Sequence, residues 1–158
     1  MFNTFVACVF LLFAQTSFAA AKVGGTFLTN LGAEPPTLNP LSSQEASASE
    51  VESYVMSSLL ERNPDTYEWE EAVAEKWNIS KDGMTFEFKI REGVKFHDGK
   101  PLTAEDVKFS FDAIMDKDNK YKTAHMRPYY ENFESVVIVD PLTVRFKAKE
   151  VYFANFDT

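Results

Sequence analysis

The segment that decides the fold reads Trp77-Asn78-Ile79-Ser80-Lys81-Asp82-Gly83-Met84-Thr85-Phe86-Glu87-Phe88-Lys89-Ile90-Arg91. Its second half alternates strictly between an apolar and a charged residue from Phe86 onward. This period of two is typical of an antiparallel strand with one buried face. Lys81-Asp82-Gly83 predicts a tight turn, because glycine adopts positive φ without strain. We therefore predict a β-hairpin made of strands 77–80 and 85–91.

A capped helix is predicted directly after this hairpin. Val94-Lys95-Phe96 indicates a short extended piece, closed by the turn His97-Asp98-Gly99. Thr103 is a natural N-cap, and two carboxylates follow it in the first turn, where the helix dipole favours negative charge. The apolar stripe of this helix consists of Val107, Phe111, Ile114 and Met115. The polar run 116–122 is interpreted as a loop.

Three further strands are predicted outside this central region. Residues 136–139 and 143–147 flank Asp140-Pro141 and are rich in β-branched residues. Residues 23–31 start from a glycine pair and carry a third apolar run. Together with the hairpin and the helices, these strands predict an α/β fold with mixed α+β character.

The segments between these strands give a loop and two further helices. Residues 32–40 contain three prolines and predict a stiff, non-helical loop. Residues 45–61 place Val51, Val55, Leu59 and Leu60 on one helical face, with Ser47 or Ser49 as the cap. Residues 70–75 predict a short helix.

The first 21 residues resemble a secretory signal peptide. An apolar run from Phe5 to Phe18 is too short to span a bilayer, and small residues follow at Ala19-Ala20-Ala21. The first four residues carry no Lys or Arg, so an uncleaved N-terminal anchor is the alternative. The chain's one cysteine, Cys8, falls inside this leader, so residues 22–158 have no disulfide and no thiolate nucleophile.

Composition and motifs argue against several classes of function. The formal net charge of −8 disfavours nucleic acid, because phosphate binding needs clustered Lys and Arg. The two histidines, His97 and His125, lie far apart and show no metal-ligand spacing. No nucleophile motif, phosphate loop or dinucleotide fingerprint is present. The sequence therefore predicts neither an enzyme nor a bound cofactor.

Residues 74–99, which contain the hairpin and the following turn, are very similar to the signature of the family 5 extracellular solute-binding proteins. The match continues through 100–110 and includes Gly24-Gly25-Thr26-Phe27 and 34–40. This resemblance implies a two-lobed fold of the type II periplasmic binding protein class, with ligand held between lobes that close around it. It implies a monomeric periplasmic receptor that passes peptides to an ABC permease and its ATPase. Nickel, sugars and opines are alternative solutes among relatives.

The same resemblance implies candidate ligand-binding residues. The loop Glu34-Pro35-Pro36-Thr37-Leu38 lies near the cleft in relatives, and its prolines would lower the ordering cost of binding. Tyr121, in the loop after the capped helix, is a further candidate. For both, a plain surface loop is the alternative.

The length of the chain adds one more expectation. Relatives run to several hundred residues, so we interpret these 158 residues as 1–21 leader and 22–158 N-terminal part of a longer receptor. A split fragment without function, or a stand-alone secreted interaction module, remains open.

Overall fold

The structure is a computed structural model that describes residues 24–26 and 28–156. The predicted leader, residues 1–21, lies outside these described residues. The chain divides into two units, Met1–Asn30 and Leu31–Thr158. In the first unit, the described residues 24–26 and 28–30 form no helix or strand. All elements named below belong to the second unit.

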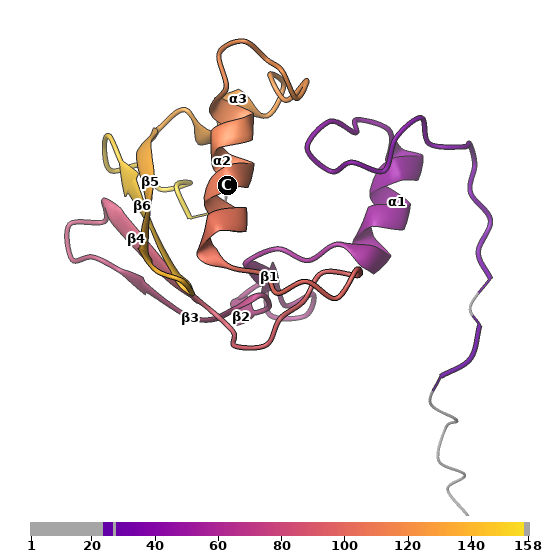
Figure 1. The fold of residues 1–158 in the computed structure, drawn as a ribbon, viewed down its shortest axis with the longest axis horizontal. Helices are drawn as coiled ribbons and strands as arrows, with labels where there is room; N and C mark the ends of the chain where they lie inside the picture. The colour runs from indigo at the N-terminus through magenta and orange to yellow at the C-terminus, as the bar shows by residue number, and fades with distance from the viewer. Residues whose placement is uncertain (1–23, 27, 157–158) are drawn as a thin grey trace, which may run out of the picture. The chain divides into compact units, whose positions relative to one another are not determined.

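A four-stranded antiparallel sheet is the centre of the second unit (Figure 1). Its strand order is β3-β4-β6-β5, and its strands are β3 (Ala74–Ile79), β4 (Thr85–Ile90), β6 (Thr143–Ala148) and β5 (Phe133–Asp140). A separate two-stranded sheet joins β1 (Leu60–Arg62) to β2 (Trp69–Glu71). The helices are α1 (Ala46–Val55), α2 (Ala104–Met115) and α3 (Arg127–Tyr130).

The predicted first hairpin is confirmed, and the two strands predicted on either side of Asp140-Pro141 pair to form a second hairpin. β3 pairs with β4 so that Trp77 lies opposite Phe88, and Gly83 in the connecting turn has φ +70°. β5 pairs with β6 across the turn at Asp140, whose Oδ1 accepts a hydrogen bond of 2.8 Å from the backbone N–H of Leu142. An Asx turn of this kind replaces a backbone turn bond with a side-chain acceptor.

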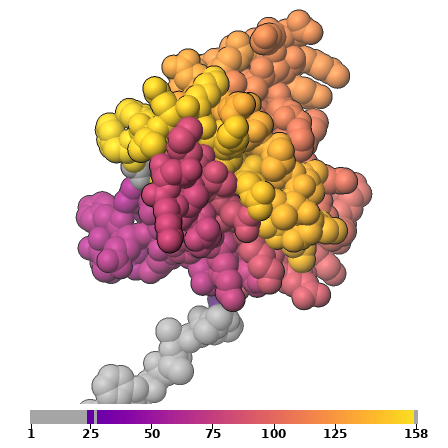
Figure 2. Space-filling view, turned by 90° about the vertical axis from the view of Figure 1, so that its left-hand side faces the viewer, coloured from indigo at the N-terminus to yellow at the C-terminus, as the bar shows by residue number. Residues whose placement is uncertain are grey.

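The two hairpins join through their inner strands, β4 and β6. Phe86 lies opposite Phe146, and Phe88 lies opposite Val144. Figure 2 shows the magenta residues of the first hairpin beside the yellow C-terminal residues. Large apolar pairs at directly opposed positions stabilise a sheet beyond its ladder hydrogen bonds.

Helix α2 covers one face of the sheet and contacts β5 and β6 (Figure 1). It begins as predicted: the backbone N–H of Thr103 donates to Asp106 Oδ2 at 2.8 Å, one half of a capping box. Its stripe buries Phe111 against a core of sheet and flanking residues, namely Val73, Phe86, Ile90, Ala104, Phe133, Val136, Val144, Phe146 and Ala148.

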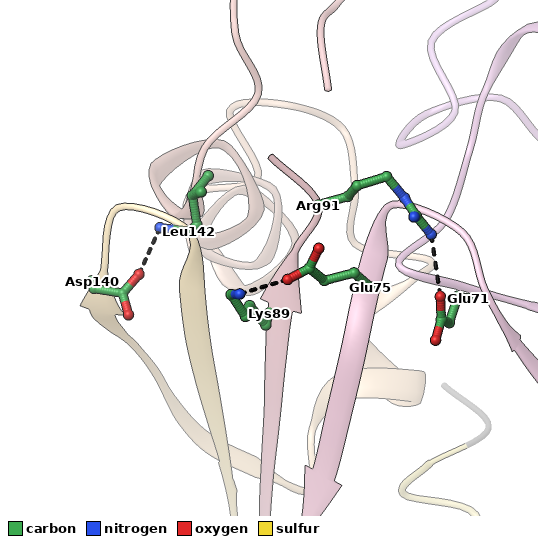
Figure 3. A network of polar contacts seen from close by, with 6 residues as sticks. All are labelled: Glu71, Glu75, Lys89, Arg91, Asp140 and Leu142. Atoms are coloured by element: carbon green, nitrogen blue, oxygen red, sulfur yellow. Dashed lines mark hydrogen bonds and ion pairs between the residues drawn. The ribbon is translucent and has the colours of Figure 1, made fainter. Parts of the chain in front are cut away.

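The opposite, solvent-facing side of the sheet carries ion pairs between neighbouring strands. Lys89 Nζ lies 2.6 Å from Glu75 Oε1, and Arg145 donates twice to Glu87 Oε2, at 2.6 and 2.9 Å. Figure 3 shows the Lys89 pair beside that of Arg91 and Glu71. The hydrogen bond from Lys89 lowers the pKa of Glu75, and the same bond raises the pKa of Lys89. Exposed pairs of this kind add little stability.

Three of the predicted helices and strands are wrong, and tertiary pairing explains two of them. The helix predicted at 45–61 ends at Val55, because Leu60 pairs with Glu71 in the small sheet. The helix predicted at 70–75 is absent: Glu70 belongs to β2, and Ala74 starts β3 opposite Ile90. Residues 24–26 and 28–31 form no strand, since none of the described strands pairs with them.

The predicted cap of α1 is also wrong. Glu45 is the N-cap, its side chain makes no capping hydrogen bond, and Ser47 and Ser49 lie inside the helix. Neither serine can therefore satisfy the first free backbone N–H groups in the way an N-cap does. Helix α1 begins without the support that the capping box gives α2.

The core predicts a clear contrast between two isoleucines on paired strands. Ile90→Ala should lower the free energy of unfolding by about 2–5 kcal/mol, because Ile90 is 0% exposed and its loss leaves a cavity. Ile79→Ala, at a position 42% exposed, is the matched control and should cost far less. Urea unfolding of the two variants measures the difference, and equal losses would contradict this core.

Candidate functional site

A hollow of about 810 Å³ opens among α1, α2, the small sheet and the large sheet. We use "the hollow" for this space throughout. Its wall is mostly apolar and includes the aromatic side chains Trp69, Phe86, Phe88, Phe96, Phe111, Tyr130, Phe133, Phe146 and Phe156. Pockets of a few hundred to a thousand Å³ with apolar walls and few polar groups are typical of small-molecule sites.

The periodicity of α2 explains one wall of the hollow. Val107, Ser110, Phe111 and Ile114 follow one another at helical spacing and therefore share a face. The sheet contributes the facing wall, because Phe86 and Phe88 belong to β4 and Phe146 belongs to the adjacent strand β6. Glu52, Ser53 and Met56, from the end of α1 and the residue after it, line a further side.

Phe156 inserts into a cluster of aromatic rings at the hollow. Its ring centroid lies 5.6 Å from that of Trp69 in an edge-on arrangement, and 6.1 and 6.2 Å from those of Phe86 and Phe88 in stacked arrangements. A tilted contact of 6.4 Å joins it to Trp77. Offset and edge-on rings at such distances attract one another beyond their buried area. The cluster therefore ties residues near position 156 to the first hairpin.

Hydrogen bonds hold the segment that carries Phe156. Asn132 Nδ2 donates to the side-chain oxygen of Asn155 at 2.6 Å and to the backbone oxygen of Glu150 at 3.1 Å. Asn155 Nδ2 donates to the same Glu150 oxygen at 3.0 Å. This network fixes the backbone on the N-terminal side of Phe156, so the ring enters the cluster from a defined position.

The polar groups of the hollow differ in how they are satisfied. Asp106 is engaged by the cap of α2, and Ser110 Oγ donates to the Asp106 backbone oxygen at 3.0 Å. Burial raises the pKa of Tyr130, so its hydroxyl stays protonated over a wider pH range. Glu52 differs from these: its Oε1 is buried and has no hydrogen-bond partner within the described part of the chain.

The sequence-predicted loop Glu34–Leu38 leads directly into the hollow without lining it. Leu38 is 45% exposed, whereas the next three residues, Asn39, Pro40 and Leu41, all line the wall. The side-chain oxygen of Asn39 accepts a hydrogen bond from the backbone N–H of Leu41 at 3.1 Å and shapes this entry. A role in contacting the ligand therefore remains a prediction for the five loop residues Glu34, Pro35, Pro36, Thr37 and Leu38.

Tyr121 lies on the loop after α2, away from the lining residues. It is 37% exposed and packs edge-on against Phe109 of α2, with ring centroids 5.6 Å apart. Lys120 Nζ lies 5.3 Å from the centroid of the Tyr121 ring. These contacts orient the ring, and its role as a ligand contact stays a prediction.

Sequence reasoning missed three groups that the fold brings to the hollow: Glu52, Trp69 and Phe156. Trp69 falls at the edge of a wrongly predicted helix, and Phe156 follows the last predicted strand without a periodic pattern. Glu52 could have been found from the sequence, because it follows Val51 on the predicted apolar face of the helix. A carboxylate on a buried face is rare without a partner and therefore indicates a candidate binding group.

Within residues 24–26 and 28–156, no group of three or more His, Cys, Asp or Glu residues is arranged to hold a metal ion. No helix in that part of the chain is long and apolar enough to cross a membrane.

The chain matches a known family over most of this region. The model of bacterial extracellular solute-binding proteins, family 5 Middle, matches residues 68–158, which include the large sheet, α2 and Phe156. The chain belongs to this family. Its members are non-enzymatic transport receptors of the periplasmic or extracellular space, and the predicted family and fold class are confirmed.

Individual relatives agree with this assignment. The oligopeptide-binding protein AppA of Bacillus subtilis is 31% identical over 136 residues, which are 86% of this chain and 24% of AppA. The structure of AgaA from A. tumefaciens R10, in complex with agropinic acid, aligns with a TM-score of 0.72 and 28% identity, covering 80% of this chain and 25% of AgaA.

A second structure is the dipeptide-binding protein of Pseudoalteromonas sp. SM9913 in complex with Met-Leu. It aligns with a TM-score of 0.69 and 26% identity, covering 80% of this chain and 28% of that protein. These neighbours are type II periplasmic binding proteins. The chain spans about a quarter of the length of the relatives it matches.

The aromatic cluster predicts that alanine substitution of Phe156 lowers stability and changes tryptophan fluorescence, whereas the same substitution of the nearby Phe153 does neither. Phe156→Ala should destabilise the chain by about 1–3 kcal/mol and change the fluorescence of Trp69 and Trp77, because a half-buried ring that contacts both is lost. Phe153→Ala, at a position 86% exposed, is the control and should leave both readouts nearly unchanged. Equal fluorescence changes in the two variants would contradict the placement of Phe156.

Proposed function

We propose that this chain is part of a periplasmic receptor that captures peptides and delivers them to an ABC permease and its ATPase for import. The observation that carries the proposal is the family match over residues 68–158, which coincides with the sheet, α2 and the aromatic cluster. The relatives support peptides as cargo: AppA is an oligopeptide-binding protein, and the Pseudoalteromonas protein holds Met-Leu.

In this proposal the chain acts by binding, and it releases its solute unchanged. Its start, residues 1–21, is a signal peptide that directs export to the periplasm, where the receptor works as a monomer. The loop Glu34–Leu38 and Tyr121 contact the ligand. The loop precedes the wall residues Asn39–Leu41, and the stiffness of Pro35-Pro36 would lower the entropy lost when a peptide orders it.

A stand-alone interaction module is the second candidate function. One observation favours it: residues 31–158 form one compact unit whose buried core links the sheet to α2. A domain with its own core can fold without further sequence. The two candidates differ in whether a small solute stabilises the chain.

Thermal unfolding of the 158-residue chain with peptides tests the proposal. A ligand at one hundred times its Kd stabilises the folded state by about 2.7 kcal/mol, which raises the Tm by roughly 5–10 °C for a chain of this size. We expect this increase with a pool of di- and oligopeptides and none with a matched pool of sugars. Unchanged Tm with every peptide, in a chain that unfolds cooperatively, would favour the interaction module.

The same assay tests one predicted contact with a matched variant. Tyr121→Ala should reduce the peptide-induced increase in Tm, whereas Tyr129→Ala, which removes an exposed tyrosine of α3, should not. An equal response of both variants would exclude Tyr121 from the binding surface.

A further inference from the structure

The charges that line the hollow have one sign. Its described lining residues include two carboxylates, Glu52 and Asp106, and contain no Lys, Arg or His. The ion pairs of the sheet lie elsewhere, on the solvent-facing side, and none of their described members lines the hollow. The hollow therefore favours a cation over an anion of the same shape, because a low-dielectric wall weakens screening by water.

Of the two carboxylates, Glu52 is the one available to a ligand. Asp106 Oδ2 already accepts hydrogen bonds from the backbone N–H and the hydroxyl of Thr103, at 2.8 and 3.1 Å. Glu52 Oε1 is buried at the wall and has no hydrogen-bond donor among the described residues. A buried acceptor without a donor costs free energy, and a charged acceptor costs more. A donor that enters the hollow removes this cost.

The rest of the wall fits an apolar body that carries such a donor. Phe88, from β4, and Phe156 supply aromatic surface, and Leu59 and Met56 supply aliphatic surface near the end of α1. Aromatic faces attract organic cations as well as apolar groups. A volume of about 810 Å³ also exceeds what one metal ion or one water needs, and it suits a compact organic molecule.

We propose that the hollow binds a compact organic cation, an ammonium group on an aromatic or branched aliphatic body, and that the ammonium donates a hydrogen bond to Glu52 Oε1. The apolar body lies against the aromatic wall. The inference does not rest on peptide import, since it concerns any primary amine of this shape.

Three probes that share a phenyl body of nearly equal size but differ in charge separate the effect of charge on affinity from that of apolar area. They are 2-phenylethylamine, which is a cation at pH 7, 2-phenylethanol, which is neutral, and 3-phenylpropionate, which is an anion. We expect calorimetric titration of the 158-residue chain to show binding in that order. The cation should bind about tenfold more tightly than the alcohol, a difference of about 1.4 kcal/mol. Trp69 fluorescence gives a second readout, because this ring lines the hollow.

Two substitutions of equal charge change locate the effect. Glu52→Gln should remove the preference for the amine over the alcohol, because the amide carries no charge. Glu61→Gln, at an exposed position of β1 that does not line the hollow, changes net charge equally and should keep the preference. Ser110→Phe places a ring in the wall formed by α2 and should weaken all three probes.

The outcomes decide the proposal even if one variant unfolds. Far-UV circular dichroism identifies folded variants, and the order of the three probes on the unsubstituted chain needs no variant. Equal affinity for the amine and the alcohol, or no binding of either at millimolar concentration, would show that Glu52 Oε1 is satisfied by water alone and would overturn the proposal. Retention of the amine preference in folded Glu52→Gln would overturn it as well. Peptide-induced stabilisation without amine binding would leave the proposed import function intact while excluding this site.

Discussion

The antiparallel pairing of β4 with β6 is the constraint on which the rest of the structure depends. It joins residues that are 58 positions apart, such as Glu87 and Arg145, and it turns two local hairpins into one sheet. Closing a connection of this length costs chain entropy, which the opposed apolar pairs Phe86–Phe146 and Phe88–Val144 must offset. Helix α2 packs on the β5 and β6 side of the joined sheet.

The hollow is a consequence of the same arrangement. Helix α2 covers β5 and β6, while Phe86 and Phe88 of the more distant strand β4 remain beside the hollow. Phe156 fills part of this space, and α1 with its free carboxylate oxygen faces the remainder. The packed half of the apolar surface thus provides stability, and the incompletely filled half forms the hollow in which we propose that an organic cation binds.

The sequence predicted the elements whose signals are local. The strict alternation of 85–91, the turn at Gly83 and the Thr103 cap all act within a few residues, and the structure contains each of them. Two of the wrong predictions concern Leu60, Glu70 and Ala74, whose conformations are set by strand partners. Helical propensity is a weak preference that such pairing overrides. The site was harder to predict from the sequence than the fold, since Glu52, Trp69 and Phe156 come to line one hollow only after the chain has folded.

Hydrogen exchange followed by mass spectrometry on the 158-residue chain tests the central role of the β4–β6 pairing most directly. Amides in the most cooperative part of a fold exchange only through global unfolding, whereas less supported elements open locally. We predict the slowest exchange in β4 and β6, and faster exchange in α1, which lacks a side-chain cap and has few buried residues. Exchange that is equally slow in α1, or fast in β4 and β6, would contradict the account.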